Sequence, residues 1–132
     1  MRVYCVDDEI IILRLIKLLV KKEDPGFKVS CFNTAEQVLK LIENGATPDL
    51  IVTDIKMPEM NGFELANRVF ELDPTIKVAY CSAFSSLKTA IESEDTEVND
   101  RQVLPFYVKP IRKDFLSFID KLLREDAVLK KN

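Results

Sequence analysis

Polar side chains of three chemical types follow the short apolar runs of this chain. They are Asp7 and Asp8, Asp54, Ser82 and Lys109, which come after residues 3–6, 50–53, 76–81 and 104–108. Carboxylates that gather at one place raise one another's pKa unless a cation lies between them. Mg²⁺ suits such a place, because it takes oxygen ligands from one or two carboxylates and keeps room for a phosphate. An amine and a hydroxyl beside it are the groups that phosphoryl transfer needs.

Each of these residues would have its own part in that chemistry. Asp54 follows the most apolar run and would be the nucleophile that meets phosphorus. Asp7 and Asp8 would hold the ion, while Lys109 neutralises the bound phosphoryl group and Ser82 exchanges a hydrogen bond with one of its oxygens. Taken singly, the same residues also have ordinary explanations as a helix cap, a turn residue, a loop hydroxyl and a solvated amine. Their combination is what favours a site.

The elements that must position these groups alternate between strands and helices. The predicted strands are residues 3–6, 28–32, 49–54, 76–81 and 104–108, and the predicted helices are 10–20, 34–43, 62–72, 87–91 and about 112–128. Thr34 with Gln37 forms a capping-box pattern, Asn44-Gly45 ends that helix, and Pro110 suits the first turn of the last helix. Five βα units predict an α/β fold, a doubly wound five-stranded parallel sheet with helices on both faces. In such sheets, functional groups collect at the carboxyl ends of the strands.

Composition excludes several other classes of protein. The 132 residues fit one domain (1–132), and 19 basic against 22 acidic residues give a net charge of −3, which argues against direct nucleic-acid binding. No apolar run approaches the roughly 20 residues of a membrane span, and acids follow the first strand too early for a secretory signal. We therefore expect a cytoplasmic protein without a membrane partner. Cys5, Cys31 and Cys81 have no metal-site spacing and are expected to be reduced, buried thiols. The chain has no histidine.

The sequence resembles the receiver domain of bacterial two-component response regulators over essentially its whole length. The resemblance rests on residues 6–9 (Val-Asp-Asp-Glu), residues 54–62, Ser82-Ala83 and Lys109-Pro110, in that order. It implies a flavodoxin-like sheet with strand order 2-1-3-4-5. It also implies that Asp54 is the phosphoacceptor of a Mg²⁺-dependent phosphorelay, with a partner histidine kinase or phosphotransfer protein as the donor. Such a chain is a signalling protein rather than an enzyme, since it catalyses only its own phosphorylation and dephosphorylation.

The resemblance implies further roles around Asp54. A backbone carbonyl at Lys56 would complete the metal site, and the Lys109-Pro110 bond would be cis. In the family's switch, the phosphoryl group draws the Ser82 hydroxyl inward and the aromatic residue at Phe106 follows; an ordinary core position is the alternative for Phe106. Small Ala83 would leave the site accessible, and Phe84 and Lys56 are expected to modulate the attack of water on the phosphoaspartate.

Two features depart from the family. The stretch from Ser82 to Lys109 is longer than usual, with the excess in Glu92–Pro105, and the usual Gly-Ala pair before the fifth strand is missing. This stretch belongs to the face of the fourth helix, fifth strand and fifth helix, which receivers use for effectors or output domains and for homodimers. The chain is either a single-domain receiver or part of a longer regulator.

Three alternative functions use the same fold or groups. An aspartate-nucleophile phosphatase would usually carry a DxD motif on the first strand, which Asp7-Asp8 does not provide. A flavin- or nucleotide-binding module would need a phosphate-binding loop where residues 7–9 are acidic. An unphosphorylated, receiver-like interaction domain would not need the complete set of acids, hydroxyl and lysine.

Overall fold

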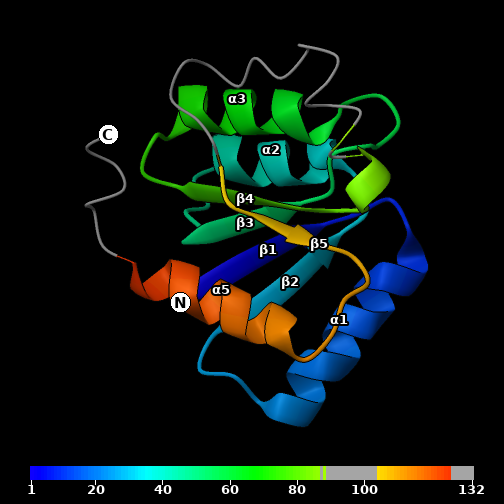
Figure 1. The fold of residues 1–132 in the computed structure, drawn as a ribbon. Helices are drawn as coiled ribbons and strands as arrows, with labels where there is room; N and C mark the ends of the chain where they lie inside the picture. The colour runs from blue at the N-terminus through cyan, green and yellow to red at the C-terminus, as the bar shows by residue number, and fades with distance from the viewer. Residues whose placement is uncertain (87, 89–103, 126–132) are drawn as a thin grey trace.

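The chain folds around a five-stranded parallel sheet in the order β2-β1-β3-β4-β5 (Figure 1). The computed structural model describes residues 1–86, 88 and 104–125. The strands are β1 (Arg2–Val6), β2 (Lys28–Phe32), β3 (Leu50–Thr53), β4 (Lys77–Ser82) and β5 (Phe106–Val108). The helices with assigned bounds are α1 (Ile10–Glu23), α2 (Ala35–Glu43), α3 (Gly62–Leu72) and α5 (Asp114–Arg124). The predicted α/β class and strand order are confirmed.

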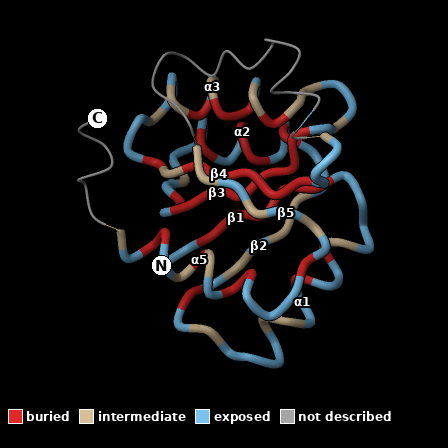
Figure 2. The backbone as a smooth tube through the Cα atoms, in the orientation of Figure 1, coloured by how far each residue is buried: buried red, intermediate tan, exposed pale blue. Residues whose placement is uncertain are grey.

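Two helical layers cover the sheet, α2 and α3 on one face and α1 and α5 on the other (Figure 1). Each layer packs on its own apolar cluster; Val38 and Leu65 lie in one, and Ile16 and Phe115 in the other. Buried residues concentrate in the central strands, while the outer helix surfaces are exposed (Figure 2). Because helices cover both faces, the ends of the strands are the parts of the sheet that the helices leave open.

The third strand is buried on both faces, as its continuous apolar run predicts. All four residues of β3, from Leu50 to Thr53, are buried, and β3 is paired with β1 on one side and β4 on the other. The residue that follows this strand, Asp54, therefore emerges at the centre of the sheet's carboxyl edge.

Local signals in the sequence explain where the helices begin and end. The Thr34 hydroxyl accepts the Gln37 N–H at 3.3 Å, and the Gln37 side chain accepts the Thr34 N–H at 3.2 Å, which confirms the capping box before α2. Gly45, just after that helix, has a φ of 101°, a conformation that favours glycine. A second capping box, between Asn61 and Glu64, opens α3. It fixes the end of the loop that begins after Asp54.

The last helix begins later than the sequence predicts. Pro110 does not lie in its first turn, because α5 starts at Asp114 and the intervening chain is held by other contacts. Ile111 is buried in the core, and the Arg112 N–H donates to the Tyr107 hydroxyl at 3.2 Å. The fifth strand is also shorter than predicted. The predicted helix 87–91 apart from Lys88, most of Glu92–Pro105 and residues 126–128 lie outside the described residues.

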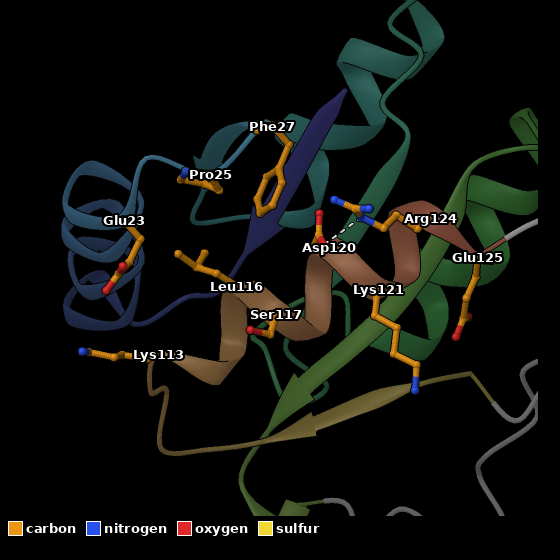
Figure 3. Close-up of a pocket in the computed structure, with 11 residues that line it drawn as sticks. Glu23, Pro25, Phe27, Lys113, Leu116, Ser117, Asp120, Lys121, Arg124 and Glu125 are labelled. Atoms are coloured by element: carbon orange, nitrogen blue, oxygen red, sulfur yellow. Dashed lines mark ion pairs between the residues drawn. The ribbon is translucent and has the colours of Figure 1, made fainter.

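Helix α5 packs against the turn between α1 and β2 (Figure 3). Leu116 and Phe27 are buried there, on the inner side of a groove of about 760 Å³. Asp120 and Arg124 pair across one turn of the helix at 2.9 Å. At the same, carboxyl-terminal end of α5, the Lys77 ammonium donates to the carbonyl of Leu122 at 2.7 Å. A cation at this position is favourable, because it meets the negative end of the helix dipole.

All three cysteines are free thiols, as predicted. Cys5 and Cys81 are buried, and burial raises the pKa of both. Cys31 is only partly buried, contrary to the expectation, because β2 is an edge strand. Among the described residues, no helix is both long and apolar enough to cross a membrane.

Gly62 is where the loop after β3 returns to the sheet. Its N–H donates to the Ile55 carbonyl at 2.8 Å, and a Cβ added to Gly62 would lie 2.3 Å from the Asp54 carbonyl oxygen. Real Cβ atoms do not approach backbone oxygen so closely, so any side chain there would displace the backbone of Asp54. Glycine at position 62 therefore fixes how closely α3 approaches Asp54.

We predict that Gly62→Ala lowers the free energy of unfolding by about 1–3 kcal/mol, the usual cost of overpacking. Urea titration followed by circular dichroism measures it. Gly26→Ala is the matched control, because a Cβ at Gly26 meets no atom within 4 Å. Equal effects of the two substitutions would contradict the close approach at Gly62.

Candidate functional site

The sheet brings Asp7, Asp54, Ser82 and Lys109 to one edge. Backbone hydrogen bonds continue past the strand ends and hold these residues in register. The Asp54 N–H donates to the Val6 carbonyl at 2.9 Å, and the Lys109 N–H donates to the Ser82 carbonyl at 2.9 Å. These residues are far apart in the sequence, and the parallel pairing of the strands alone makes them neighbours.

The Asp54 carboxylate lies at the centre of the group and is contacted on both oxygens. Ser82 Oγ donates to Asp54 Oδ1 at 2.7 Å, and the Ile55 N–H donates to the same oxygen at 2.7 Å. Lys109 Nζ lies 3.2 Å from Oδ2. Asp54 is 5% exposed and Ser82 is 1% exposed, so protein groups hold the orientation of this carboxylate.

Lys109 is the cation that contacts the carboxylates of the site. Its ammonium nitrogen lies 2.7 Å from Asp7 Oδ2, 3.2 Å from Asp54 Oδ2 and 3.9 Å from Glu9 Oε1. Burial by itself would lower the pKa of Lys109, but the hydrogen bonds and negative charges of Asp7 and Asp54 outweigh it, and the pKa is raised. Lys109 therefore stays charged and is shared between the carboxylates.

The pKa of Asp7 is raised above its ordinary value, so its carboxyl group ionises less readily than a free aspartate. Burial raises the pKa of Asp7, and the hydrogen bonds from Lys109 and from the Glu9 N–H offset this only in part. The negative charge of Asp54 adds to the rise. The carboxylates thus carry more negative charge than one lysine compensates.

Carboxylate oxygens of Asp7, Glu9 and Asp54 lie within 4.8 Å of one another. Hard oxygen donors, excess negative charge and a raised pKa at Asp7 are together the setting that Mg²⁺ favours. The residues present therefore fit this ion. Sequence reasoning assigned Asp7, Asp8, Asp54 and the backbone carbonyl of Lys56 to it. In the structure Asp8 is exposed and lies outside the close carboxylate group, although it lines the pocket above.

A pocket of about 500 Å³ opens over the site. Its lining comes from the loops after β1, β3, β4 and β5 and includes Asp8, Glu9, Asp54, Lys56, Met57, Pro58, Ser82, Ala83, Ser86 and Lys109. Lys56 and Ala83, two of the expected modulators, therefore border the space above Asp54. Phe84 does not line this pocket and is 66% exposed.

The two remaining expectations concern β5 and the bond after it. The Lys109-Pro110 peptide bond is cis, as the resemblance implied. Phe106 is 47% exposed and Val108 is 39% exposed, so Phe106 is not a core residue, and its role in a switch stays a prediction.

Sequence reasoning missed Glu9 and Gly62. Glu9 is the third acid of the run after β1, and its proximity to Lys109 could have been suspected from that run. The constraint at Gly62 had a weaker signal, a glycine after Asn61 at the start of a helix. No pattern in the sequence indicates that this glycine touches the backbone of Asp54.

The sequence matches the family described as response regulator receiver domain over residues 3–117. It is similar to the chemotaxis protein CheY of Thermotoga maritima, with 34% identity over 107 residues, covering 80% of this chain and 86% of that protein. It is also similar to the chemotaxis protein CheY of Bacillus subtilis, with 32% identity over 125 residues, covering 92% of this chain and 97% of that protein.

Solved structures share the fold. A CheY-like receiver domain protein from Methanospirillum hungatei superposes with a TM-score of 0.73 at 29% identity, covering 98% of this chain and 96% of that one. The response regulator TrrA of Thermotoga maritima, in complex with Mg(2+)-BeF, gives a TM-score of 0.69 at 28% identity, covering 92% of this chain and 97% of that one. Since the family match covers most of the sequence and these relatives align along most of their own length, the chain belongs to the response regulator receiver domain family.

Proposed function

We propose that this chain is a signalling phosphoacceptor that receives a phosphoryl group on Asp54 from the phosphohistidine of a partner kinase or phosphotransfer protein. The observation that carries the proposal is the surroundings of Asp54, whose carboxylate lies below an open pocket between a hydroxyl donor, Ser82, and an ammonium, Lys109. A buried carboxylate that served only the fold would not need a pocket above it. Membership of the receiver family supports the same role.

The transfer itself needs little covalent chemistry from the protein. A carboxylate oxygen of Asp54 attacks phosphorus, the phosphorus–nitrogen bond to the donor histidine breaks, and that nitrogen keeps the electron pair. Charge on the transferring group spreads over its three outer oxygens, so the task of the site is to position and neutralise them. Lys109 is placed to contact one of these oxygens, and the Ser82 hydroxyl can turn from Asp54 to donate to another.

Asp7, Glu9 and Asp54 are the residues that would hold Mg²⁺, with Asp8 and Lys56 at the rim of the pocket. When bound, Mg²⁺ would neutralise the carboxylates and the incoming phosphoryl oxygens. The Mg(2+)-BeF complex of the related TrrA supports this assignment. Asp7 would gain from such an ion, because its carboxylate is buried and its pKa is raised.

The signal would leave the site through β4 and β5. Val108 pairs with Ser82, and Phe106 pairs with Tyr80 two residues earlier on β4. A movement of the Ser82 hydroxyl toward a phosphoryl group would first change the packing of these neighbours. Phe106 and Val108 are exposed apolar side chains, and an effector, an output domain or a second copy of the chain could cover them.

The phosphoacceptor assignment predicts one covalent change. Incubation with acetyl phosphate and Mg²⁺ should add one phosphoryl group to the wild type and none to Asp54→Asn, as measured by intact mass. Asp49→Asn is the matched control, because Asp49 precedes the same strand at its other end and should leave labelling unchanged. Labelling that persists in Asp54→Asn would refute the assignment.

The metal assignment predicts a stability change that does not depend on phosphorylation. Mg²⁺ at ten- to hundredfold above its dissociation constant should raise the free energy of unfolding of the wild type by about 1.4–2.7 kcal/mol relative to EDTA. Asp7→Asn should lose most of that gain. Asp24 is exposed and follows α1, so Asp24→Asn removes the same charge away from the site and should keep the gain. Chemical denaturation with and without the ion measures both. A full Mg²⁺ response in Asp7→Asn would show that the ion binds elsewhere.

A further inference from the structure

The connection between β5 and α5 carries Lys109 and is tied down at several points. It runs over residues 109–113. At its start, the Lys109 N–H donates to the Ser82 carbonyl at 2.9 Å, and in its middle Ile111 is buried in the core. The far end is held by a side chain of β5 itself, Tyr107. Because Lys109 is the cation that contacts the carboxylates of the site, whatever fixes this connection also fixes where the ammonium can reach.

Tyr107 reaches across the connection with its hydroxyl. The Tyr107 O–H donates to Asp114 Oδ1 in the first turn of α5, and its oxygen accepts the Arg112 N–H at 3.2 Å. The Tyr107 ring lies edge-on to Phe115, with 5.1 Å between ring centroids, and is tilted against Phe118 at 5.5 Å. Burial, with the bond to Asp114, raises the pKa of Tyr107 to about 12. The hydroxyl therefore stays protonated and able to donate.

We propose that Tyr107 is a positioning residue for Lys109: its hydroxyl closes the β5–α5 connection and so holds the ammonium between Asp7 and Asp54. This inference rests on the proposed phosphoacceptor function. Tyr107 lies two residues before Lys109, and the ring contacts of Tyr107 anchor it to α5. When the hydroxyl bonds are present, the start of α5 and the end of β5 form one unit. Without them, the connection keeps its bond at Lys109, the burial of Ile111 and the bonds that the first turn of α5 donates to the Arg112 and Lys113 carbonyls, but it loses its tie to the β5 side chain.

The hydroxyl and the ring of Tyr107 make different contacts, so substitution can remove one set and keep the other. The contacts with Phe115 and Phe118 use the ring, so Tyr107→Phe keeps them and removes only the bonds to Arg112 and Asp114. Tyr80 offers a matched control on the neighbouring strand. Its hydroxyl is buried and makes no hydrogen bond that the described part of the chain provides, so Tyr80→Phe removes a hydroxyl without releasing the connection.

The test is the rate at which the full chain gains a phosphoryl group from acetyl phosphate and Mg²⁺, followed by intact mass. We expect Tyr107→Phe and Asp114→Ala to be slower than the wild type by about three- to tenfold, since small displacements of a catalytic group are costly. Asp114→Asn keeps an acceptor oxygen, so its rate should be closer to that of the wild type than the rate of Asp114→Ala. Tyr80→Phe should match the wild type.

A double-mutant cycle tells positioning of Lys109 from a general effect on the fold. If Tyr107 acts through Lys109, Tyr107→Phe should slow the wild type but cause no further loss in a Lys109→Ala background. Equal slowing in both backgrounds, or a wild-type rate in Tyr107→Phe, would overturn the inference. A wild type that gains no phosphoryl group would instead overturn the proposed function, so the two failures are distinguishable.

Discussion

The carboxylates at the carboxyl edge of the sheet can coexist there because one partly buried ammonium, that of Lys109, lies among them. Lys109 is within 2.7 Å of Asp7 and 3.2 Å of Asp54, and its side chain is only 12% exposed. Charges held this far from water are costly unless they are paired, and removing one partner leaves the others uncompensated. The raised pKa of Asp7 indicates that the balance is incomplete. This deficit of positive charge suits the edge to a divalent cation.

The fold serves this charge balance by fixing the backbone of each participant. Asp54 follows a strand that is buried on both faces, and its N–H is bonded to Val6 on β1. Lys109 is bonded through its N–H to Ser82 on β4. Gly62 allows α3 to begin against the Asp54 carbonyl, which a larger residue would displace. The backbone of each of these groups is therefore tied to the sheet, whereas the pocket above them is lined by the loops that follow the strands.

Much of this arrangement could be predicted from sequence because the signals are local and repeated. Alternating apolar periods gave the order of strands and helices, and Thr34 with Gln37 marked the start of α2. The convergence of Asp7, Asp54, Ser82 and Lys109 followed from one rule about the ends of parallel strands. What the sequence could not supply was the orientation of individual side chains. Asp8 and Glu9 are adjacent acids, and only the path of the chain after β1 decides that Glu9 comes nearer to Lys109.

The later start of α5 also depends on contacts that the sequence alone does not show. A proline after Lys109 is an ordinary helix-start signal, but burial of Ile111 and the hydrogen bond from Arg112 to Tyr107 hold the chain out of the helix until Asp114. These are tertiary contacts between residues of β5, the connection and α5, so no local sequence pattern predicts them. They also set the geometry of the residue on which the charge balance depends.

The central claim is that the Lys109 ammonium compensates the buried carboxylates, and the free energy of unfolding of Lys109→Met tests it most directly. Breaking a buried ion pair from one side costs roughly 3–5 kcal/mol, and water at the rim screens part of this. In EDTA near neutral pH, we expect Lys109→Met to be less stable than the wild type by at least about 2 kcal/mol, with part of the loss recovered on adding Mg²⁺. Lys113→Met, an exposed lysine of the same connection, should change little. A Lys109→Met protein as stable as the wild type in EDTA would contradict the account.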